Sequence, residues 1–458
     1  MDEQKRMILS DNLWSVMWKL SWPAIVAMVL YGLNMIVDAI FVGKFVGEDA
    51  LAGVSIAYQL SALTLGLGSL IGVGAGSLLG ISLGANDVHV QKRLIGNVNY
   101  ITIVVSVVYT IVGLVFAVPL VKLMGGTGAA LEMGVAYYKI TVIGSVFWIY
   151  GLAANMLVRA EGKMKSAAVM MGAGLLINIL FNYIFIVLLE YGVSGAAWAT
   201  NIGMLVYTLM GILYFKKGKA TFPVSNPFAV HRDKQIVKSI VSMGMPSLIM
   251  NIMIAIQAVV VFDVLSKHGT LYDIAFYGAV FRIFNFLMTP IFGLMRALQP
   301  VLSINYGAQQ YDRVIKGFWI FVAAGMLFIL PFWAMFMISP QTILGTMFDV
   351  STITNASLLN AQIFLSILPL LSFVFMAMTL FPAIDHSKPA TVLGIVRQVI
   401  FYMPIMIIMP RMFGLDWVYV GSALIDLATL AIALVYVLKA FKKLKAAEYS
   451  NRQANAST

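Results

Sequence analysis

The sequence predicts an all-α membrane protein with twelve transmembrane helices in two six-helix bundles related by an internal pseudo-twofold repeat. Of its 458 residues, 61% are hydrophobic and only 11% are charged, whereas soluble domains average about 45–50% apolar and ~25% charged residues. So few polar residues cannot coat a water-facing surface, which excludes a soluble enzyme, a nucleic-acid-binding protein and a disordered chain. The absence of cysteine excludes disulfides and thiolate metal sites, and the four scattered histidines predict no metal centre.

Twelve apolar segments are long enough to cross a bilayer, because a transmembrane helix needs about 20 mostly apolar residues. These segments lie near residues 15–42, 51–78, 94–118, 133–158, 166–189, 194–215, 238–265, 274–300, 314–338, 357–380, 390–410 and 417–438. The longest polar interruption lies near the midpoint of the chain. We therefore expect an N-terminal six-helix lobe at 1–215, a cytoplasmic linker at 216–236, a C-terminal lobe at 237–440 and a basic cytoplasmic tail at 441–458.

The distribution of basic residues predicts the orientation in the membrane. With the N-terminus inside, the inside segments hold 22 of the 30 Lys and Arg residues and the outside loops hold four. Cytoplasmic loops are rich in Lys and Arg, so we expect a multi-pass protein of the cytoplasmic membrane with both termini in the cytoplasm. The same rule accounts for the net charge of +11 without nucleic acid. The basic tail is expected to contact anionic membrane lipids, and we expect a monomer.

The two halves of the chain repeat at a constant numbering offset. Pro23 matches Pro246, Gly84 matches Gly307, and the same offset of 223 relates further pairs. Each half has an even number of spans, so both insert with the same orientation, as in repeats that enclose the cavity of alternating-access transporters. No GxxxxGK[ST] segment occurs, so an ion gradient rather than ATP would supply the energy. A duplicated scaffold without transport activity is the alternative.

Two compositional features bear on packing and on the cavity. Glycine recurs every four residues in the second span, at Gly68, Gly72, Gly76, Gly80 and Gly84. Residues four apart share one helix face, and small residues allow close packing of membrane helices. The 29 methionines and 12% aromatic residues favour an apolar cavity of broad specificity, because methionine-rich surfaces adapt to different ligands.

Polar side chains of three spans are predicted to meet at one depth in the first half. Ionisable residues inside a membrane are costly and are therefore functional candidates. At a rise of ~1.5 Å per residue, Asp38, Asn182 and Thr200 lie at a similar depth, and Asn178 lies one turn deeper. A carboxylate with amide and hydroxyl oxygens suits Na⁺, and it equally suits a buried carboxyl that carries a proton. We therefore predict a cation-coupling site here, with H⁺ and Na⁺ both open.

The second half lacks this cluster, since its equivalents of Asp38 and Asn178 are Val261 and Phe401. It has its own intramembrane charges, Asp263, Arg282 and Asp426. Arg282 and Asp426 lie at a similar depth, so a structural ion pair between them is one expectation. Asp263 and Asp426 are also candidates for a direct role in binding substrate or protons.

The motifs of the chain, in their order and spacing, resemble those of the multidrug and toxic compound extrusion (MATE) family, and within it the MepA-like branch. They are VDAIFVG at 37–43, RAEGK at 159–163, NIL at 178–180, GVSGAA at 192–197, PIFGL at 290–294, QP at 299–300 and NYGA at 305–308. The resemblance covers nearly the whole chain. It implies two six-helix bundles around a V-shaped cavity, and export of organic cations by H⁺ or Na⁺ antiport without a cofactor.

The resemblance also implies which residues form a cation site. The family's cation site in the N-terminal lobe matches Asp38, Asn178 and Thr200, which would be the ligands of Na⁺. Relatives commonly have Asp where this chain has Asn182 and Pro where it has Tyr183, so the cluster here keeps one negative charge. A second departure is the Asp385–His386 pair, where relatives often carry Gly and small residues.

The sequence thus predicts an antiporter that exports lipophilic organic cations and is not an enzyme. The alternative is a flippase of the same superfamily for a lipid-linked saccharide, which would use Arg282, Arg296 and Arg397 to hold a pyrophosphate. An integral membrane enzyme finds no support, because no Ser/His/Asp set, paired His/Asp ligands or metal motif is present. A non-transporting scaffold is a further alternative.

Overall fold

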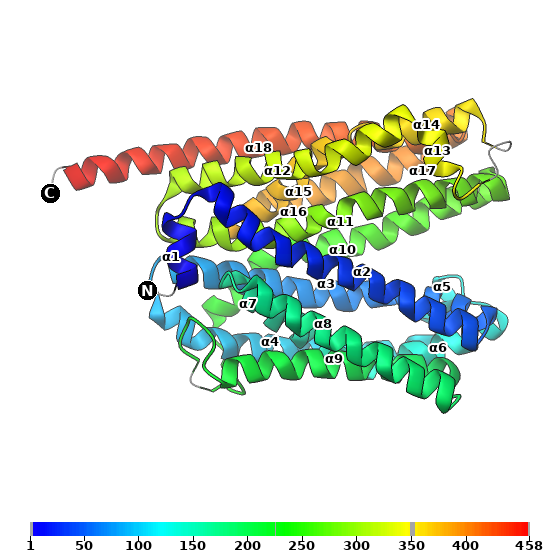
Figure 1. Ribbon diagram of the computed structural model, residues 1–458, viewed down its shortest axis with the longest axis horizontal. Helices are drawn as coiled ribbons and strands as arrows, with labels where there is room; N and C mark the ends of the chain where they lie inside the picture. The colour runs from blue at the N-terminus through cyan, green and yellow to red at the C-terminus, as the bar shows by residue number, and fades with distance from the viewer. Residues whose placement is uncertain (1–2, 225, 349–352, 457–458) are drawn as a thin grey trace.

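The computed structural model describes residues 3–224, 226–348 and 353–456, which are almost entirely helical (Figure 1). No strand occurs in these ranges. The elements are α1 (Glu3–Ser10), α2 (Leu13–Phe45), α3 (Glu48–Gly84), α4 (Val88–Val115), α5 (Ala117–Leu123), α6 (Gly128–Ile143), α7 (Ser145–Ala160), α8 (Met164–Asn182), η1 (Tyr183–Leu188), α9 (Gly192–Lys216), α10 (Lys234–His268), α11 (Leu271–Gly307), α12 (Tyr311–Ile338), α13 (Pro340–Leu344), α14 (Asn355–Leu365), α15 (Leu368–Ala383), α16 (Lys388–Ile395), η3 (Val396–Tyr402), α17 (Met403–Phe413) and α18 (Trp417–Ala456).

Helical segments long and apolar enough to cross a membrane number eleven in the described residues, or twelve when α6 and α7 count as one bent span. This confirms the predicted fold class. The predicted span at 133–158 is the bent pair, whose two helices meet at 55°. The break falls at Gly144, where a Cβ atom would lie 2.2 Å from Oδ1 of Asn201 on α9. Only glycine lets the bend approach α9 this closely.

Side-chain caps fix the beginnings of several long helices. The Asn12 side chain accepts a hydrogen bond from the Trp14 N–H at the start of α2, and Asp87 caps α4 in the same way. Thr270 and Asp273 form a capping box at the start of α11. Such caps satisfy backbone donors that the first helical turn leaves free.

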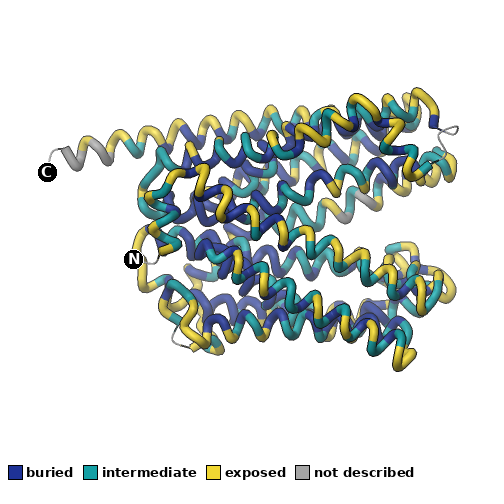
Figure 2. The backbone as a smooth tube through the Cα atoms, in the orientation of Figure 1, coloured by how far each residue is buried: buried dark blue, intermediate teal, exposed yellow. Residues whose placement is uncertain are grey.

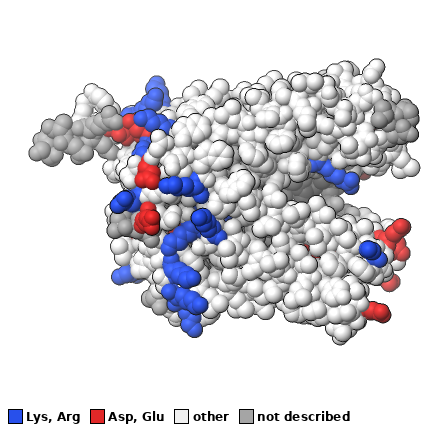
Figure 3. Space-filling model, in the orientation of Figure 1, with Lys and Arg blue, Asp and Glu red and all other residues white. Residues whose placement is uncertain are grey.

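The helices form two lobes, α2–α9 and α10–α18 (Figure 1). Buried residues lie inside each lobe and where the lobes meet (Figure 2). The lobes join through α3 with α10 and through α2 with α11. They diverge toward the end opposite the termini, where the space-filling view shows a hollow between them (Figure 3). In that view, basic side chains gather toward the end that carries both termini.

We call the end that carries both termini, where the lobes are in contact, the closed end. Contacts there follow the internal repeat. A Cβ atom on Gly84 would lie 2.1 Å from the Ile304 carbonyl oxygen, and one on Gly307 would lie 2.1 Å from the Ile81 carbonyl oxygen. The two contacts are exchanged by the numbering offset of the repeat, so α3 and α11 cross about a local pseudo-twofold axis. The glycine stripe of α3 therefore packs closely, as predicted. Gly76, Gly80 and Gly84 face α11, whereas Gly68 and Gly72 face Leu152 and Met156 of α7.

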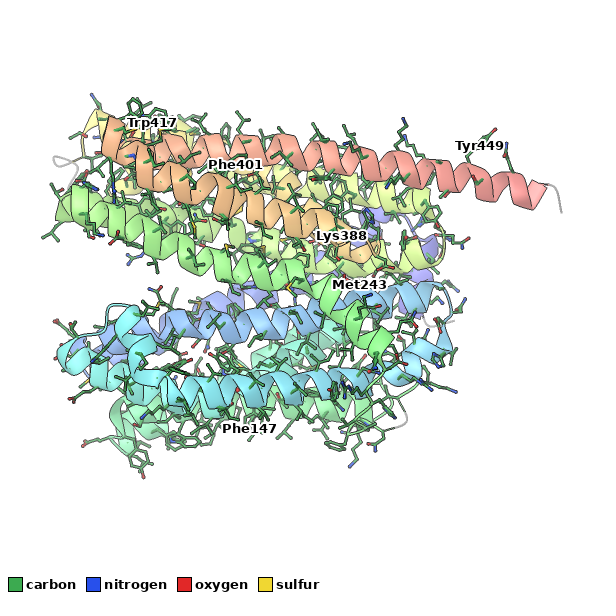
Figure 4. The ribbon with its side chains drawn as sticks, turned by 180° about the vertical axis from the view of Figure 1, so that it is seen from behind. Phe147, Met243, Lys388, Phe401, Trp417 and Tyr449 are labelled. Atoms are coloured by element: carbon green, nitrogen blue, oxygen red, sulfur yellow. The ribbon has the colours of Figure 1, made fainter. Side chains whose placement is uncertain are left out.

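The linker is attached to the N-terminal lobe. α9 ends at Lys216 and α10 begins at Lys234. Between them, the Asn99 amide of α4 donates to the carbonyl oxygens of Pro227 and Ala229 at 2.9 and 2.7 Å. In the predicted tail at 441–458, the described residues to Ala456 belong to α18, which continues without a break, and the last two residues lie outside the described part. Tyr449 projects with this helix beyond the bundle (Figure 4).

Candidate functional site

The N-terminal lobe brings Asp38 together with amide side chains from two helices. Asn182 on α8 donates to Asp38 Oδ1 at 2.5 Å, and Asn34, one turn before Asp38 on α2, donates to its Oδ2 at 3.4 Å. Asn182 is 1% exposed, and its Oδ1 is buried without a hydrogen-bond partner. The described residues give Asp38 hydrogen-bond donors but no basic partner. The carboxylate is therefore held by neutral groups alone.

Asn178 links this carboxylate to α9. In the amide orientation that hydrogen bonding favours, its nitrogen donates to Asn34 Oδ1 and Asp38 Oδ1, both at 2.9 Å, and its oxygen faces the Thr200 N–H at 3.3 Å. Hydrogen-bond networks decide such amide orientations. The Thr200 hydroxyl donates to the Ala196 carbonyl at 3.0 Å. The structure thus gathers Asp38, Asn182 and Thr200, which were predicted to share this depth, with Asn178, predicted one turn deeper, and their role in coupling stays a prediction.

A cavity of about 550 Å³ opens beside this cluster inside the N-terminal lobe. Asn34 and Asn178 line it toward Asp38, and Tyr31 and Tyr207 line it deeper in the lobe. The rest of its wall is mainly apolar: Leu65, Trp148, Leu152, Met171, Gly174, Leu175 and Met204. The cavity therefore combines an adaptable apolar wall with amide groups that contact the Asp38 carboxylate beside it.

The C-terminal lobe arranges its charges differently. Asp426 on α18 accepts hydrogen bonds from Nε and Nη2 of Arg397, at 3.0 and 2.7 Å. The expected pairing of Asp426 with Arg282 is wrong. Arg282 is exposed on α11, whereas the π-helical turn η3 carries Arg397 beside α18. A π-helical turn changes which side chains face a neighbour, so the depth of a residue does not identify its partner.

A second cavity, of about 970 Å³, lies in the C-terminal lobe. The Arg397–Asp426 pair and the Gln257–Gln398 hydrogen bond of 2.9 Å supply polar groups in its wall. Much of the remaining wall is aromatic or methionine: Phe281, Phe284, Phe292, Phe364, Phe375, Met250 and Met378. The charged groups in this wall neutralise each other.

The third predicted charge, Asp263, is exposed on α10 and pairs with Lys267 at 2.8 Å, one turn along the same helix. This surface pair gives no support to a direct role in substrate binding. Sequence reasoning also missed two polar residues. Asn34 has the i,i+4 spacing that would have revealed its contact with Asp38, and Gln257 is its equivalent at the offset of 223.

The loops at the closed end also differ between the lobes. Glu161, just after α7, is buried and accepts hydrogen bonds from the Thr221 N–H and from the Tyr214 hydroxyl. Burial raises the pKa of the Glu161 carboxyl to about 7. Its equivalent after α15 is the apolar Ile384. Asp385, in the left-handed region at φ 52°, follows it, and burial raises the pKa of Asp385 while His386 opposes the shift.

Comparisons with known proteins agree with this architecture. The family model MatE matches residues 23–184 and, a second time, residues 246–408. The multidrug export protein MepA of Staphylococcus aureus strain MRSA252 is 26% identical over 443 residues, which cover 96% of this chain and 97% of the relative. The two matched segments begin at the equivalent residues Pro23 and Pro246, in register with the internal repeat.

Solved structures share the fold. A crystal structure of MATE in the bent conformation superposes with a TM-score of 0.90 at 21% identity, covering 98% of this chain and 100% of the other. An outward-facing conformation of a multidrug resistance MATE family transporter gives a TM-score of 0.88 at 21% identity, with coverages of 97% and 99%. MATE transporters are not enzymes. Since the family model matches most of the chain, the chain belongs to the MatE family of multidrug efflux transporters.

Proposed function

We propose that this protein is an H⁺- or Na⁺-coupled antiporter that exports lipophilic organic cations across the cytoplasmic membrane by alternating access. The observation that carries the proposal is Asp38, a carboxylate in a membrane helix that is held only by neutral amides beside a mainly apolar cavity. Such a group is costly unless a cation neutralises it. A proton, Na⁺ or the cationic group of a substrate can each do so, and the three then compete for one carboxylate.

The surrounding oxygen atoms support competition by a cation. Asn182 Oδ1 is buried without a hydrogen-bond donor, and buried polar atoms usually have a partner. Asp38, Asn178 and Thr200 supply further oxygens for Na⁺, and a proton needs only the carboxylate. Coupling follows from the competition: an ion that enters from outside displaces the substrate cation, and a substrate cation that binds from inside displaces the ion.

The arrangement of the lobes supports an outward-open state. The excess of Lys and Arg in the segments on the side of the termini favours both termini in the cytoplasm. The lobes are joined at that end, so the hollow between them (Figure 3) would open to the outside. In this state the Asp38 cluster would exchange ions with the external solution. The substrates are expected to be small organic cations, and we expect a monomer surrounded by lipid.

The flippase alternative receives no support from the arginines it would need. Arg282 is exposed, Arg397 is neutralised by Asp426, and Arg296 faces the other lobe. These three residues therefore do not form one pyrophosphate site.

The test is efflux of a lipophilic dye cation from proteoliposomes, driven by a pH gradient or, separately, by a Na⁺ gradient. We expect one gradient to drive efflux by the wild type and neither to drive it in Asp38→Asn. Glu132→Gln, which removes an exposed carboxylate of α6 in the same lobe, is the matched control and should retain efflux. Gradient-driven efflux at the wild-type rate in Asp38→Asn would refute the assignment of coupling to this carboxylate.

A further inference from the structure

Two arginines from opposite lobes come together near Met156 of α7, where the lobes meet. Arg159 on α7 is only 3% exposed. Its Nε donates to Asn155 Oδ1 at 2.7 Å, but its Nη1 is buried without a hydrogen-bond partner. Arg296 on α11 reaches across the interface, where its Nη1 lies 3.6 Å from Sδ of Met156. Met156 is one turn from Arg159 on α7, and the two guanidinium groups repel each other.

Tyr207 on α9 completes the cluster. It is buried, its hydroxyl has no hydrogen-bond partner in the described residues, and this phenol group lies within electrostatic range of both arginines. The three side chains are rich in donors: a guanidinium has five N–H groups and no acceptor, and a phenol has one O–H. The described ion pairs include none that neutralises Arg159 or Arg296. Two like charges in this position lack the counter-ion that buried charges require.

The other lobe shows what is missing here. Arg397, also within a membrane helix, has a carboxylate partner in Asp426 at 2.7 Å. Arg313, near the closed end, donates to the backbone carbonyls of Ile8 and Asp11. In the described residues, the hydrogen-bond acceptors of Arg159 and Arg296 are one side-chain amide and one thioether sulfur. A ligand of negative charge would supply the acceptor that the protein itself does not.

We propose that Arg159, Arg296 and Tyr207 form a binding site for a single anionic group of carboxylate or halide size. The planar fork of arginine matches a carboxylate in a bidentate arrangement, and the buried hydroxyl adds a third donor. The site joins the two lobes, because Arg296 belongs to the C-terminal lobe and the other two residues to the N-terminal lobe. A bound anion therefore stabilises the closed end of the molecule.

The anion has two sources that share this chemistry: a free ion, or the carboxylate of a transported zwitterion. The second rests on the proposed function. Thr200 and Tyr207 are seven residues apart on α9, about 10 Å at the helical rise. The cavity wall thus includes Asn178, which contacts Asp38, and Tyr207, which belongs to the proposed anion site. A substrate that carries an ammonium group and a carboxylate at this separation would match Asp38 and the proposed anion site.

Thermal unfolding of the purified full-length protein in detergent tests the site without any transport. At constant ionic strength, sodium methanesulfonate, whose tetrahedral sulfonate is larger than a carboxylate or a halide, is replaced stepwise by sodium bromide or sodium acetate. Because a ligand of the folded state stabilises it in proportion to its saturation, we expect a saturable rise of about 3 °C in Tm for the wild type. The rise should vanish in Arg296→Gln and persist in Arg411→Gln, which removes an exposed arginine of α17. A Tm that is the same in all three salts, or that rises equally in Arg296→Gln, overturns the proposal.

Arg296→Lys guards against a variant that fails to fold. It keeps the charge and loses the fork, so we expect a retained bromide effect and a smaller acetate effect. Equal loss of both would contradict the bidentate arrangement. A second experiment separates a free anion from the carboxylate of a substrate. Binding of an aromatic amino acid dye, which is a zwitterion, is compared with binding of its methyl ester, which lacks the carboxylate. An affinity about tenfold lower for the zwitterion in Arg296→Gln, with the ester unchanged, assigns the site to the substrate. Equal affinities of both dyes in the wild type, with the salt effect intact, assign it to a free anion.

Discussion

The two lobes share one scaffold but differ in the charge of their cavities. At the numbering offset of the repeat, Asn34 corresponds to Gln257, so each cavity keeps an amide at this position. Asp38 corresponds to Val261, and Asn178 to Phe401, which Figure 4 labels in the C-terminal lobe. In the described residues, a carboxylate without a basic partner therefore lies beside the N-terminal cavity, whereas the wall of the C-terminal cavity contains the Arg397–Asp426 ion pair. Under the proposed function, ion coupling belongs to the N-terminal half, because an unpaired carboxylate lies beside the cavity of that half alone among the described residues.

The largest effect should follow from moving the carboxylate between the lobes. We expect Asp38→Asn to reduce gradient-driven dye efflux to the level of protein-free liposomes, because a neutral amide cannot exchange a proton or Na⁺ for a substrate cation. The double variant Asp38→Asn/Val261→Asp restores a carboxylate at the equivalent position, but without the amides of Asn178 and Asn182. Its efflux should remain at background. Recovery to the wild-type rate would show that the lobes are interchangeable.

The second prediction concerns the neutral pair of the C-terminal lobe. Arg397→Met leaves Asp426 largely buried without its partner, and breaking such a pair costs about 3–5 kcal/mol. We expect a lower unfolding temperature in detergent. The double variant Arg397→Met/Asp426→Leu should recover most of the loss, since no unpaired charge remains. If the single and double variants unfold alike, the pair is not what stabilises this cavity.

Glu161 gives a pH-dependent contrast with Ile384, its equivalent. Its pKa is raised to about 7 in the folded protein, against ~4.3 in an unfolded chain. Between these values the folded state keeps a proton that the unfolded state loses, so folding stability falls as pH rises. Relative to Glu161→Gln, the wild type should lose roughly 4 kcal/mol across this window. The measurement is Tm against pH for both proteins, and parallel curves would contradict a buried carboxyl with a raised pKa.

The smallest effect should come from adding a carboxylate to the N-terminal cluster. Asn182→Asp places a second negative charge beside Asp38, so Na⁺ binding should tighten by about tenfold, or ~1.4 kcal/mol. Binding can be measured as the stabilisation of the purified protein by Na⁺. Asn285→Asp adds a carboxylate to the wall of the C-terminal cavity and should leave Na⁺ binding unchanged. An equal gain in both variants would mean that added charge alone, in either lobe, is sufficient.

Much of this fold could be predicted because membrane helices are constrained by length and charge. Apolar runs of about 20 residues, the offset between the halves and the uneven distribution of Lys and Arg define the spans and the two lobes. Counting residues from a membrane boundary also brought Asp38, Asn182 and Thr200 to one depth, because the helical rise is constant. The α6–α7 bend could not be predicted in this way, since it depends on how closely Gly144 approaches Asn201.

Partners within the membrane could be predicted less well. Depth does not give the rotation of a helix, so Asp426 was matched with Arg282 when the π-helical turn η3 turns Arg397 toward it. Arg159 directly follows the predicted span at 133–158, and its approach to Arg296 depends on how the lobes close. Such contacts between distant segments leave no periodic signal in one sequence.

The most direct measurement of the central assignment is the number of ions released when a dye cation binds to the purified protein in weakly buffered solution. If Asp38 exchanges its ion for the substrate, the wild type should release about one H⁺ or Na⁺ per bound dye. Arg397→Met/Asp426→Leu should release the same number, and Asp38→Asn should release none. Undiminished release by Asp38→Asn, together with its loss in the C-terminal double variant, would contradict coupling in the N-terminal lobe.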